Sequence, residues 1–218
     1  MAPEAPVFLV GDSNAVAIGL AARAAGRAIR GGPVGIGLDL EQPFFRVENG
    51  DFLLLGAKRA HLVDEFRDLL RHDGPILSTA GFNALRFARR LDDFTAAQGA
   101  AHWSEVISEQ VMCQLIRDTR AEVLALYKLL NDHGRRVYFL HSPQRGPAQY
   151  LPTLRELEAR LVPMVQQTGA RLIDIRDRIT GPDGPCPEYA QPGDPAHGNA
   201  RMGALALDAL DAALAHEP

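Results

Sequence analysis

The sequence predicts a three-layer α/β/α domain built on a mainly parallel sheet of about five strands. Short apolar runs alternate with helical patterns along the chain, and the longest helical pattern carries apolar residues at i, i+3, i+4 and i+7. Such alternation is typical of right-handed crossovers that cover both faces of a parallel sheet. With 218 residues, the chain is long enough for a substantial core, and a single domain over 1–218 is expected.

Each element is expected from a local pattern. Strands are expected where apolar residues run together, at 7–10, 76–80, 137–141 and 172–175, with a shorter one at 27–30. Helices are expected where apolar residues recur with helical spacing, at about 14–26, 58–71, 104–133, 152–168 and 199–215.

Two segments interrupt the alternation and are expected to be insertions. Residues 31–55 are rich in glycine and phenylalanine and contain Asn49-Gly50, a turn signal that predicts a β-hairpin. Residues 91–103 are expected to form a second, irregular insertion that ends at His102 and Trp103.

Composition excludes several classes of protein. The net charge of −4 gives no reason to expect nucleic acid as a partner. No apolar run approaches the roughly 20 residues of a membrane span, and no secretory signal is recognisable, so a cytoplasmic location is expected. Cys113 and Cys186 do not suggest a disulfide framework. The histidines lack the spacing of metal ligands, and no dinucleotide or P-loop fingerprint occurs, so neither a metal nor a cofactor is expected.

A serine follows the first expected strand. Ser13 lies in Gly-Asp-Ser-Asn at the carboxyl end of 7–10, where parallel α/β sheets bind ligands. The following helix exposes free N–H groups and a positive dipole end, which would suit a developing oxyanion. The same residue types are also preferred helix caps, so the segment taken alone is equally a plain strand-to-helix turn.

An Asp-x-x-His pattern precedes the last expected helix. Asp194 and His197 are three residues apart, so the carboxylate can reach the imidazole and fix its tautomer. A solvated surface loop would have a similar composition. However, Ser13 and His197 are both expected at the same edge of the sheet, and together they provide a nucleophile and its base.

A third pattern follows the strand expected at 76–80. Gly81 allows close approach of the backbone, and the side chain of Asn83 can donate a hydrogen bond to an oxyanion. Asn83 could equally cap the next helix.

With these residues, the chain resembles the SGNH hydrolases, also called the GDSL family. The family's first block matches 11–13 (Gly-Asp-Ser), with Asn14 where leucine is common. Its third block, Gly-x-Asn-Asp, matches 81–83, with Ala84 in place of the aspartate. Its fifth block, Asp-x-x-His, matches 194–197, and 199–203 resembles the family's continuation into the final helix. The substitutions place the chain in an atypical branch.

The resemblance implies a flavodoxin-like fold and a division of roles. Ser13 would attack an acyl carbonyl, His197 would act as general base and then acid, and Asp194 would orient His197. The oxyanion would be held by the Ser13 N–H, the Asn83 side chain and the N–H of a second-block glycine. For that glycine Gly35 is favoured, Gly32 is nearly as good, and Gly31 and Gly37 remain open.

Four further residues are candidates for substrate contact. Asp12 and Asn14 flank the serine. Phe82 either shapes the pocket or fills the core, and Trp103 is either a pocket wall or a packing residue.

The expected function is hydrolysis of a carboxylic ester through an acyl-Ser13 intermediate, with no metal or organic cofactor. The expected partner is a small acyl ester or an acylated sugar or natural product. An O-acyltransferase or thioesterase would use the same nucleophile. A catalytically silent ligand-binding domain of the same fold is the alternative from a different class.

Overall fold

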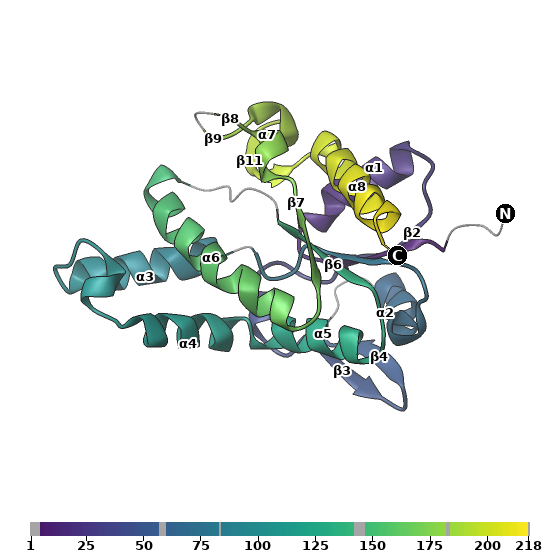
Figure 1. Cartoon of the computed structure of the whole chain (residues 1–218), viewed down its shortest axis with the longest axis horizontal. Helices are drawn as coiled ribbons and strands as arrows, with labels where there is room; N and C mark the ends of the chain where they lie inside the picture. Colours follow the sequence, from purple (N-terminus) through teal and green to yellow (C-terminus); the bar gives the residue numbers. More distant parts are fainter. Residues whose placement is uncertain (1–4, 57–59, 83, 142–146, 182–183, 218) are drawn as a thin grey trace.

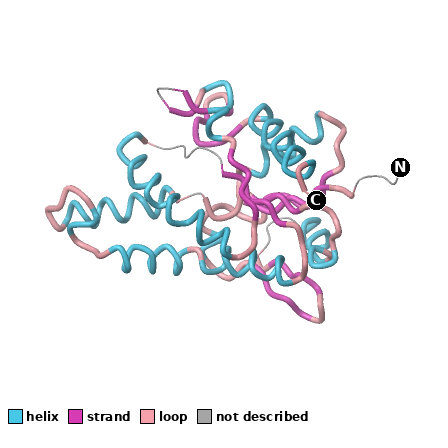
Figure 2. The backbone as a smooth tube through the Cα atoms, in the orientation of Figure 1, coloured by secondary structure: helices cyan, strands magenta, loops and turns pink. Residues whose placement is uncertain are grey.

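The computed structural model describes residues 5–56, 60–82, 84–141, 147–181 and 184–217 (Figure 1). A parallel sheet of five strands lies at its centre, with helices around it (Figure 2). The strand order is β2-β1-β5-β6-β7, the doubly wound flavodoxin-like arrangement. The predicted fold class is confirmed. The strands are β1 (Val7–Gly11), β2 (Ile29–Pro33), β5 (Ile76–Ser78), β6 (Val137–His141) and β7 (Arg171–Asp174).

Both faces of the sheet are covered, as the apolar strand runs require. On β1, Val7 and Leu9 face one layer while Phe8 and Val10 face the other, because side chains alternate along a strand. The first layer consists of α1 (Ala15–Ala24) and α8 (Ala200–Ala215). The second contains α2 (Ala60–Arg67), α3 (Leu85–Ala97), α5 (Ala121–Asp132) and α6 (Leu151–Gln167). Figure 1 shows the two layers on opposite sides of the sheet.

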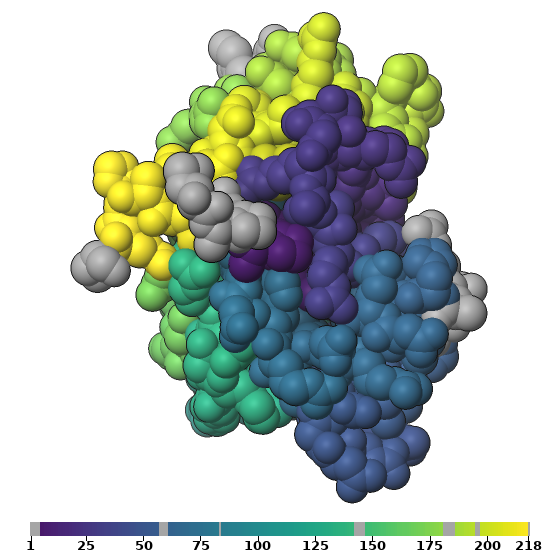
Figure 3. Space-filling view, turned by 90° about the vertical axis from the view of Figure 1, so that its right-hand side faces the viewer, coloured from purple at the N-terminus to yellow at the C-terminus, as the bar shows by residue number. Residues whose placement is uncertain are grey.

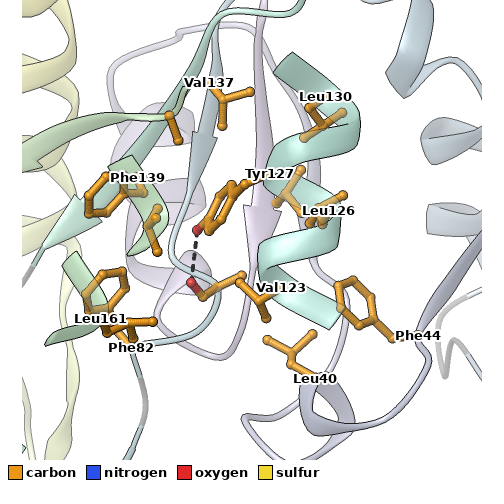
Figure 4. Packing of buried hydrophobic residues seen from close by; sticks show 14 of the residues in the cluster. Leu40, Phe44, Phe82, Val123, Leu126, Tyr127, Leu130, Val137, Phe139 and Leu161 are labelled. Carbon is orange, nitrogen blue, oxygen red and sulfur yellow. Dashed lines mark hydrogen bonds between the residues drawn. The ribbon is translucent and has the colours of Figure 1, made fainter. Parts of the chain in front are cut away.

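The core of the second layer is tightly packed around one buried tyrosine. Tyr127 on α5 lies against Val123, Leu126 and Phe139 (Figure 4). Its hydroxyl bonds to the Ser78 hydroxyl and donates to the Ala80 carbonyl, both at 2.9 Å. Burial raises the pKa of this phenol above its ordinary value, so the group stays neutral. Tyr127 thereby ties α5 to the end of β5.

Strand β2 begins two residues later than expected. Its sequence, Ile-Arg-Gly-Gly-Pro, lacks an apolar run, yet Gly31 and Gly32 continue the ladder opposite Leu9 and Val10. A side chain at Gly31 would collide with the Leu9 carbonyl, so the strand requires glycine there.

The predicted hairpin is confirmed within the first insertion. β3 (Phe45–Glu48) pairs antiparallel with β4 (Asp51–Leu54). Asn49 and Gly50 connect them with φ of 53° and 81°, the signs that a type I′ turn demands. A short 3-10 helix, η1 (Asp39–Glu41), precedes the hairpin, and η2 (Leu69–Arg71) follows α2.

Two expectations about the middle of the chain are wrong. The segment 91–103 is not an irregular insertion over its first half, because α3 continues to Ala97 with Ala88, Leu91 and Thr95 buried along one face. The helix expected over 104–133 is divided into α4 (Glu109–Thr119) and α5, preceded by η3 (Trp103–Glu105). Arg120 separates α4 from α5 because its buried side chain binds groups outside the helix.

Besides α6 and β7, the last third of the chain holds several short elements ahead of α8. They are η4 (Ala148–Tyr150), α7 (Arg176–Ile179), β8 (Thr180–Gly181), β9 (Gly184–Pro185), η5 (Pro187–Tyr189), β10 (Ala190–Gln191) and β11 (Asp194–Gly198). Among the described residues, no helix has the length and apolarity to span a membrane.

Candidate active site

Ser13 lies in the turn between β1 and α1, and the end of β5 fixes this turn. The backbone N–H of Asp12 donates to the Thr79 hydroxyl at 3.2 Å. One carboxylate oxygen of Asp12 accepts from that hydroxyl at 3.2 Å and from the N–H of Asn14 at 2.9 Å. A side chain at Gly11 would collide with Thr79, so glycine is required for this contact. These bonds hold the backbone of Ser13 at the carboxyl edge of the sheet.

The structure brings Ser13, His197 and Asp194 together. Ser13 Oγ lies 2.9 Å from His197 Nε2, and His197 Nδ1 lies 2.6 Å from an Asp194 carboxylate oxygen. If Nδ1 carries the proton and donates to Asp194, Nε2 is left with a lone pair toward the serine hydroxyl. The hydroxyl can then donate to this nitrogen. A hydroxyl, an imidazole and a carboxylate connected in this order form the geometry of a Ser-His-Asp triad.

Asn199 holds the histidine segment in place. Its side-chain oxygen accepts from the N–H groups of Arg201 and Met202, and so caps α8. Its amide nitrogen donates to the carbonyls of Glu188 and Ala190, at 2.7 and 2.8 Å. The cap therefore fixes the segment that carries His197 both to α8 and to the preceding loop.

Helices α1 and α8 lie side by side, and the residues of the triad lie just before them. Ser13 is two residues before α1, and His197 is three residues before α8. Figures 1 and 3 show the two helices in contact. A side chain at Gly203 on α8 would collide with the Ala17 carbonyl on α1, so the backbones approach closely. The distance between Ser13 and His197 thus depends on how these helices pack.

Comparisons with known proteins agree with this architecture. No protein-family model and no curated protein matches the chain by sequence. A catalytic variant of an acetylxylan esterase from Geobacillus stearothermophilus matches in structure, with a TM-score of 0.53 and 11% identity over 98% of this chain and 95% of that chain. A GDSL-like lipase from Bacteroides thetaiotaomicron matches with a TM-score of 0.50 and 13% identity, over 98% and 91%.

The protein has the SGNH hydrolase fold. This confirms the fold that the sequence motifs imply, at an identity too low to transfer individual residues. The chemistry of the site therefore depends on its own geometry.

Some backbone N–H groups of the loops after β1 and β2 make no hydrogen bond within the described residues. They are those of Ser13, Gly35 and Gly37. The loop that carries Gly35 is tied to the end of β1, next to Ser13, because the N–H of Val34 donates to the Gly11 carbonyl at 2.8 Å. Gly37 lies farther along the same loop. Asn83, the expected third donor, lies outside the described residues.

The other candidate glycines are less suitable for this role. Gly31 and Gly32 lie inside β2 rather than beyond its end, and the N–H of Gly31 donates to a Glu65 carboxylate oxygen at 2.7 Å. Their positions in the chain therefore favour Gly35 or Gly37 over Gly31 and Gly32 as the glycine that would donate to an oxyanion.

The side chain of Asp12 is fully buried, where its hydrogen bonds support the turn that carries Ser13. Burial raises the pKa of its carboxyl group, and the hydrogen bonds from Asn14 and Thr79 oppose this rise only in part. Its second carboxylate oxygen has no hydrogen-bond partner among the described residues. Asn14 is only partly buried and lies next to Ser13, so it remains a candidate for substrate contact.

The two aromatic candidates are packing residues in this structure. Phe82 is buried and stacks on Phe139, with ring centroids 5.4 Å apart. Trp103 is buried as well. Its indole N–H donates to Glu156 on α6 at 2.6 Å, and the Arg160 guanidinium lies over its ring. The described side-chain contacts of Trp103 are with Glu156 and Arg160 of α6 and with the His102 ring, and they fit the packing interpretation.

Arg120 is a residue near the site that the motifs did not reveal. It is almost fully buried, donates to the Gly81 carbonyl at 2.8 Å, and pairs with Glu41 at 3.2 Å. It therefore connects the loop after β5 with the loop after β2, which are the two loops expected to supply oxyanion donors. The sequence did contain a sign that Arg120 is buried. Arg120 has helical spacing with the apolar residues Ile116, Val123 and Tyr127, and it is the charged residue on that buried stripe.

No metal site emerges in the part of the chain that the structure describes. Within it, no three His, Cys, Asp or Glu side chains are grouped as metal ligands would be.

Proposed function

We propose that the protein hydrolyses a carboxylic ester through a covalent acyl-Ser13 intermediate. The observation that carries this proposal is the hydrogen-bonded series from Ser13 Oγ through both nitrogens of His197 to Asp194, at 2.9 and 2.6 Å. This arrangement provides a nucleophile, its base and a group that orients the base.

In the first half of the reaction, Ser13 Oγ attacks the ester carbonyl carbon and its proton passes to His197 Nε2. The carbonyl oxygen takes up the electron pair of the broken π bond, stabilised by the N–H groups of Ser13 and Gly35. By the family resemblance, the Asn83 side chain would be a third donor. The imidazolium, held by Asp194, then protonates the leaving oxygen as the C–O bond breaks. The products are an alcohol and acyl-Ser13.

In the second half, water attacks the acyl carbonyl carbon while His197 takes one of its protons. When the tetrahedral intermediate collapses, this proton returns to Ser13 Oγ and the carboxylic acid leaves. The reaction needs no group besides the ester and water.

The structural neighbours support the assignment of roles. Three catalytic variants of the Geobacillus esterase replace a serine at position 15, an aspartate and a histidine, the last two being three positions apart. Here the corresponding types are Ser13, and Asp194 with His197 three positions later. That neighbour is described as an acetyl-xylooligosaccharide esterase, which supports an acylated sugar or another small acyl ester as the substrate class.

Hydrolysis of 4-nitrophenyl acetate and butyrate by the wild type and two variants tests the proposal. We expect Ser13→Ala and His197→Ala each to lower kcat at least about 10³-fold, because each removes a member of the catalytic series. Ser104→Ala, on the exposed η3 segment, is the matched control and should keep the wild-type rate. Retention of the wild-type rate by Ser13→Ala would refute the acyl-Ser13 intermediate.

A further inference from the structure

A groove of about 810 Å³ lies beside α3. Its walls come from three segments: the loop and short helix at 36–41, the first half of α3, and residues 147–150. Each segment follows the carboxyl end of one parallel strand, namely β2, β5 and β6. Ser13 follows β1, which lies between β2 and β5 in the sheet. The groove and the triad therefore belong to the same edge of the sheet, where SGNH and other doubly wound folds bind their ligands.

One face of α3 gives the groove a basic wall. Arg86, Arg89, Arg90 and Asp93 line it, with the spacing i, i+3, i+4 and i+7 that places residues on one side of a helix. Three arginines are thus grouped in a protein whose net charge is −4. This local charge opposes that of the whole chain.

The acidic residues of the groove do not neutralise this wall. Asp93 is 3.8 Å from Arg89, and Glu41 is paired with the buried Arg120. Within the described residues, Arg86 and Arg90 make no ion pair. Two exposed guanidinium groups in the groove are therefore available to a ligand.

The rest of the lining is largely apolar. Leu38, Leu85, Pro147 and Tyr150 line the groove, together with Ile36, which is 52% exposed. Such a surface suits the carbon chain of a small ligand, while the guanidinium groups suit an anionic end. A guanidinium binds a carboxylate or a phosphate through two parallel hydrogen bonds.

We propose that this groove binds the substrate through an anionic group, a carboxylate or a phosphate, held by Arg86 and Arg90. The substrate class is then an ester with a negative charge away from the scissile bond. This inference rests on the proposed ester hydrolysis for its choice of substrate, but the groove can be tested without turnover.

Two matched ester pairs test the proposal and distinguish the source of the charge. In 4-nitrophenyl hemiglutarate the acyl part carries a carboxylate, and 4-nitrophenyl pentanoate is its neutral partner. In the acetyl ester of glycerol 3-phosphate the alcohol part carries a phosphate, and monoacetylglycerol is its neutral partner. We expect at least one anionic member to have the higher kcat/KM. We also expect Arg86→Gln/Arg90→Gln to lower the anionic-to-neutral ratio about tenfold, which corresponds to 1.4 kcal/mol.

A double variant with the same charge change is the control. Arg23 and Arg67 lie in the last turns of α1 and α2, at the opposite edge of the sheet. Arg23→Gln/Arg67→Gln should leave the anionic-to-neutral ratio at its wild-type value. If both double variants keep the wild-type ratio, the groove does not select for charge and the proposal is wrong, while ester hydrolysis stands.

Equilibrium binding to Ser13→Ala separates this proposal from the proposed function. We expect the preferred anionic ester to bind this variant more tightly than its neutral partner, and the additional loss of Arg86 and Arg90 to abolish the difference. The same result with a wild type that hydrolyses none of the four esters would support the groove and contradict the hydrolase. Equal binding of each pair to Ser13→Ala would overturn the groove proposal, whatever the turnover.

Discussion

At the scale of single residues, the hydrogen-bond partner of the Ser13 hydroxyl comes from the other end of the chain. His197 lies 184 positions away and yet within 2.9 Å of the serine hydroxyl. Asp194 is only three positions from His197, so their contact is local. The local pair was recognisable as Asp-x-x-His. The proximity of Ser13 to His197 could be expected only because the end of the first strand and the start of the last helix were both expected at one edge of the sheet.

Asp194→Asn should lower kcat about 10³-fold, because an amide no longer fixes the productive tautomer of His197 or balances the imidazolium. The free energy of unfolding should change by less than about 1 kcal/mol, since the aspartate side chain is 44% exposed. Stopped-flow or steady-state assays give the first quantity and urea titration the second. Asp208→Asn, on an exposed position of α8, is the control. A fall in kcat of less than threefold would contradict the role of Asp194.

The buried carboxyl of Asp12 makes stability depend on pH. Its pKa is raised by burial, so the folded protein retains this proton to a higher pH than the unfolded chain does. Its contribution to the free energy of unfolding is constant below the ordinary value of 3.8, falls as pH rises toward the raised pKa, and stays low above it. Above pH 3.8, Asp12 therefore lowers the free energy of unfolding, because the unfolded chain ionises this carboxyl in water while burial opposes its ionisation in the folded protein.

Asp12→Asn should accordingly stabilise the protein at pH 7 by about 1 kcal/mol, because it removes a buried titratable group and keeps the acceptor for Asn14 and Thr79. This gain should diminish as pH falls through the window below the raised pKa. Asp12→Leu, which loses the acceptor, should instead destabilise. Urea titrations of the three proteins at several pH values measure these differences. A gain for Asp12→Asn that does not vary with pH would show that the charge of Asp12 is not its cause.

At the scale of elements, the pair α1 and α8 determines whether the triad assembles. Helix α1 begins beside Ser13 and α8 begins beside His197, so a change in their separation changes the distance between nucleophile and base. Gly203 allows the close contact and Gly19, also in this helix pair, does not take part in it.

Gly203→Ala should destabilise the protein by about 2 kcal/mol and lower kcat, because the new methyl group collides with the Ala17 carbonyl. Gly19→Ala is the matched control, since a methyl group there meets no atom within 4 Å. It should stabilise by about 0.5–1 kcal/mol through helix propensity. Thermal or urea unfolding with parallel ester assays measures both effects. Equal stability of the two variants would contradict the packing argument.

Arg120 connects the junction of α4 and α5 with η1 and with the loop after β5. Its removal should therefore lower both the free energy of unfolding and kcat. Arg120→Gln leaves the Gly81 carbonyl and the Glu41 carboxylate without this partner, so we expect a loss of about 3 kcal/mol and a lower kcat. Lys128→Gln, which breaks an exposed ion pair on α5, should cost at most about 0.5 kcal/mol. Urea unfolding compares the two. A cost for Arg120→Gln no larger than that for Lys128→Gln would show that the buried contacts contribute little.

The sequence patterns were most informative where an element depends on its own residues. β1 and β6 are continuous apolar runs buried on both faces, so they were predicted nearly to the residue. β2 was misplaced because its pairing uses two glycines that carry no hydrophobic signal. The break at Arg120 could not be predicted, because it depends on contacts with Gly81 and Glu41, which lie far away in sequence.

At the scale of the whole molecule, the strand order places the candidate site residues at one edge of the sheet. β1 lies between β2 and β5, so the loops after these three strands adjoin and carry Ser13, Gly35 and the segment that leads into α3. The groove with its basic wall adjoins the same edge, although the chain as a whole is acidic. Motifs indicated the triad, whereas the groove required the fold, because its three walls lie far apart in sequence.

The most direct test of the central claim is intact-mass labelling with a fluorophosphonate, which reacts with activated serine nucleophiles. The wild type should gain the mass of one phosphonyl group, and Ser13→Ala should gain none. Asp194→Asn should be labelled more slowly, since the base is less well oriented. An unlabelled wild type, or a Ser13→Ala variant labelled as fast as the wild type, would contradict the account of Ser13 as the nucleophile.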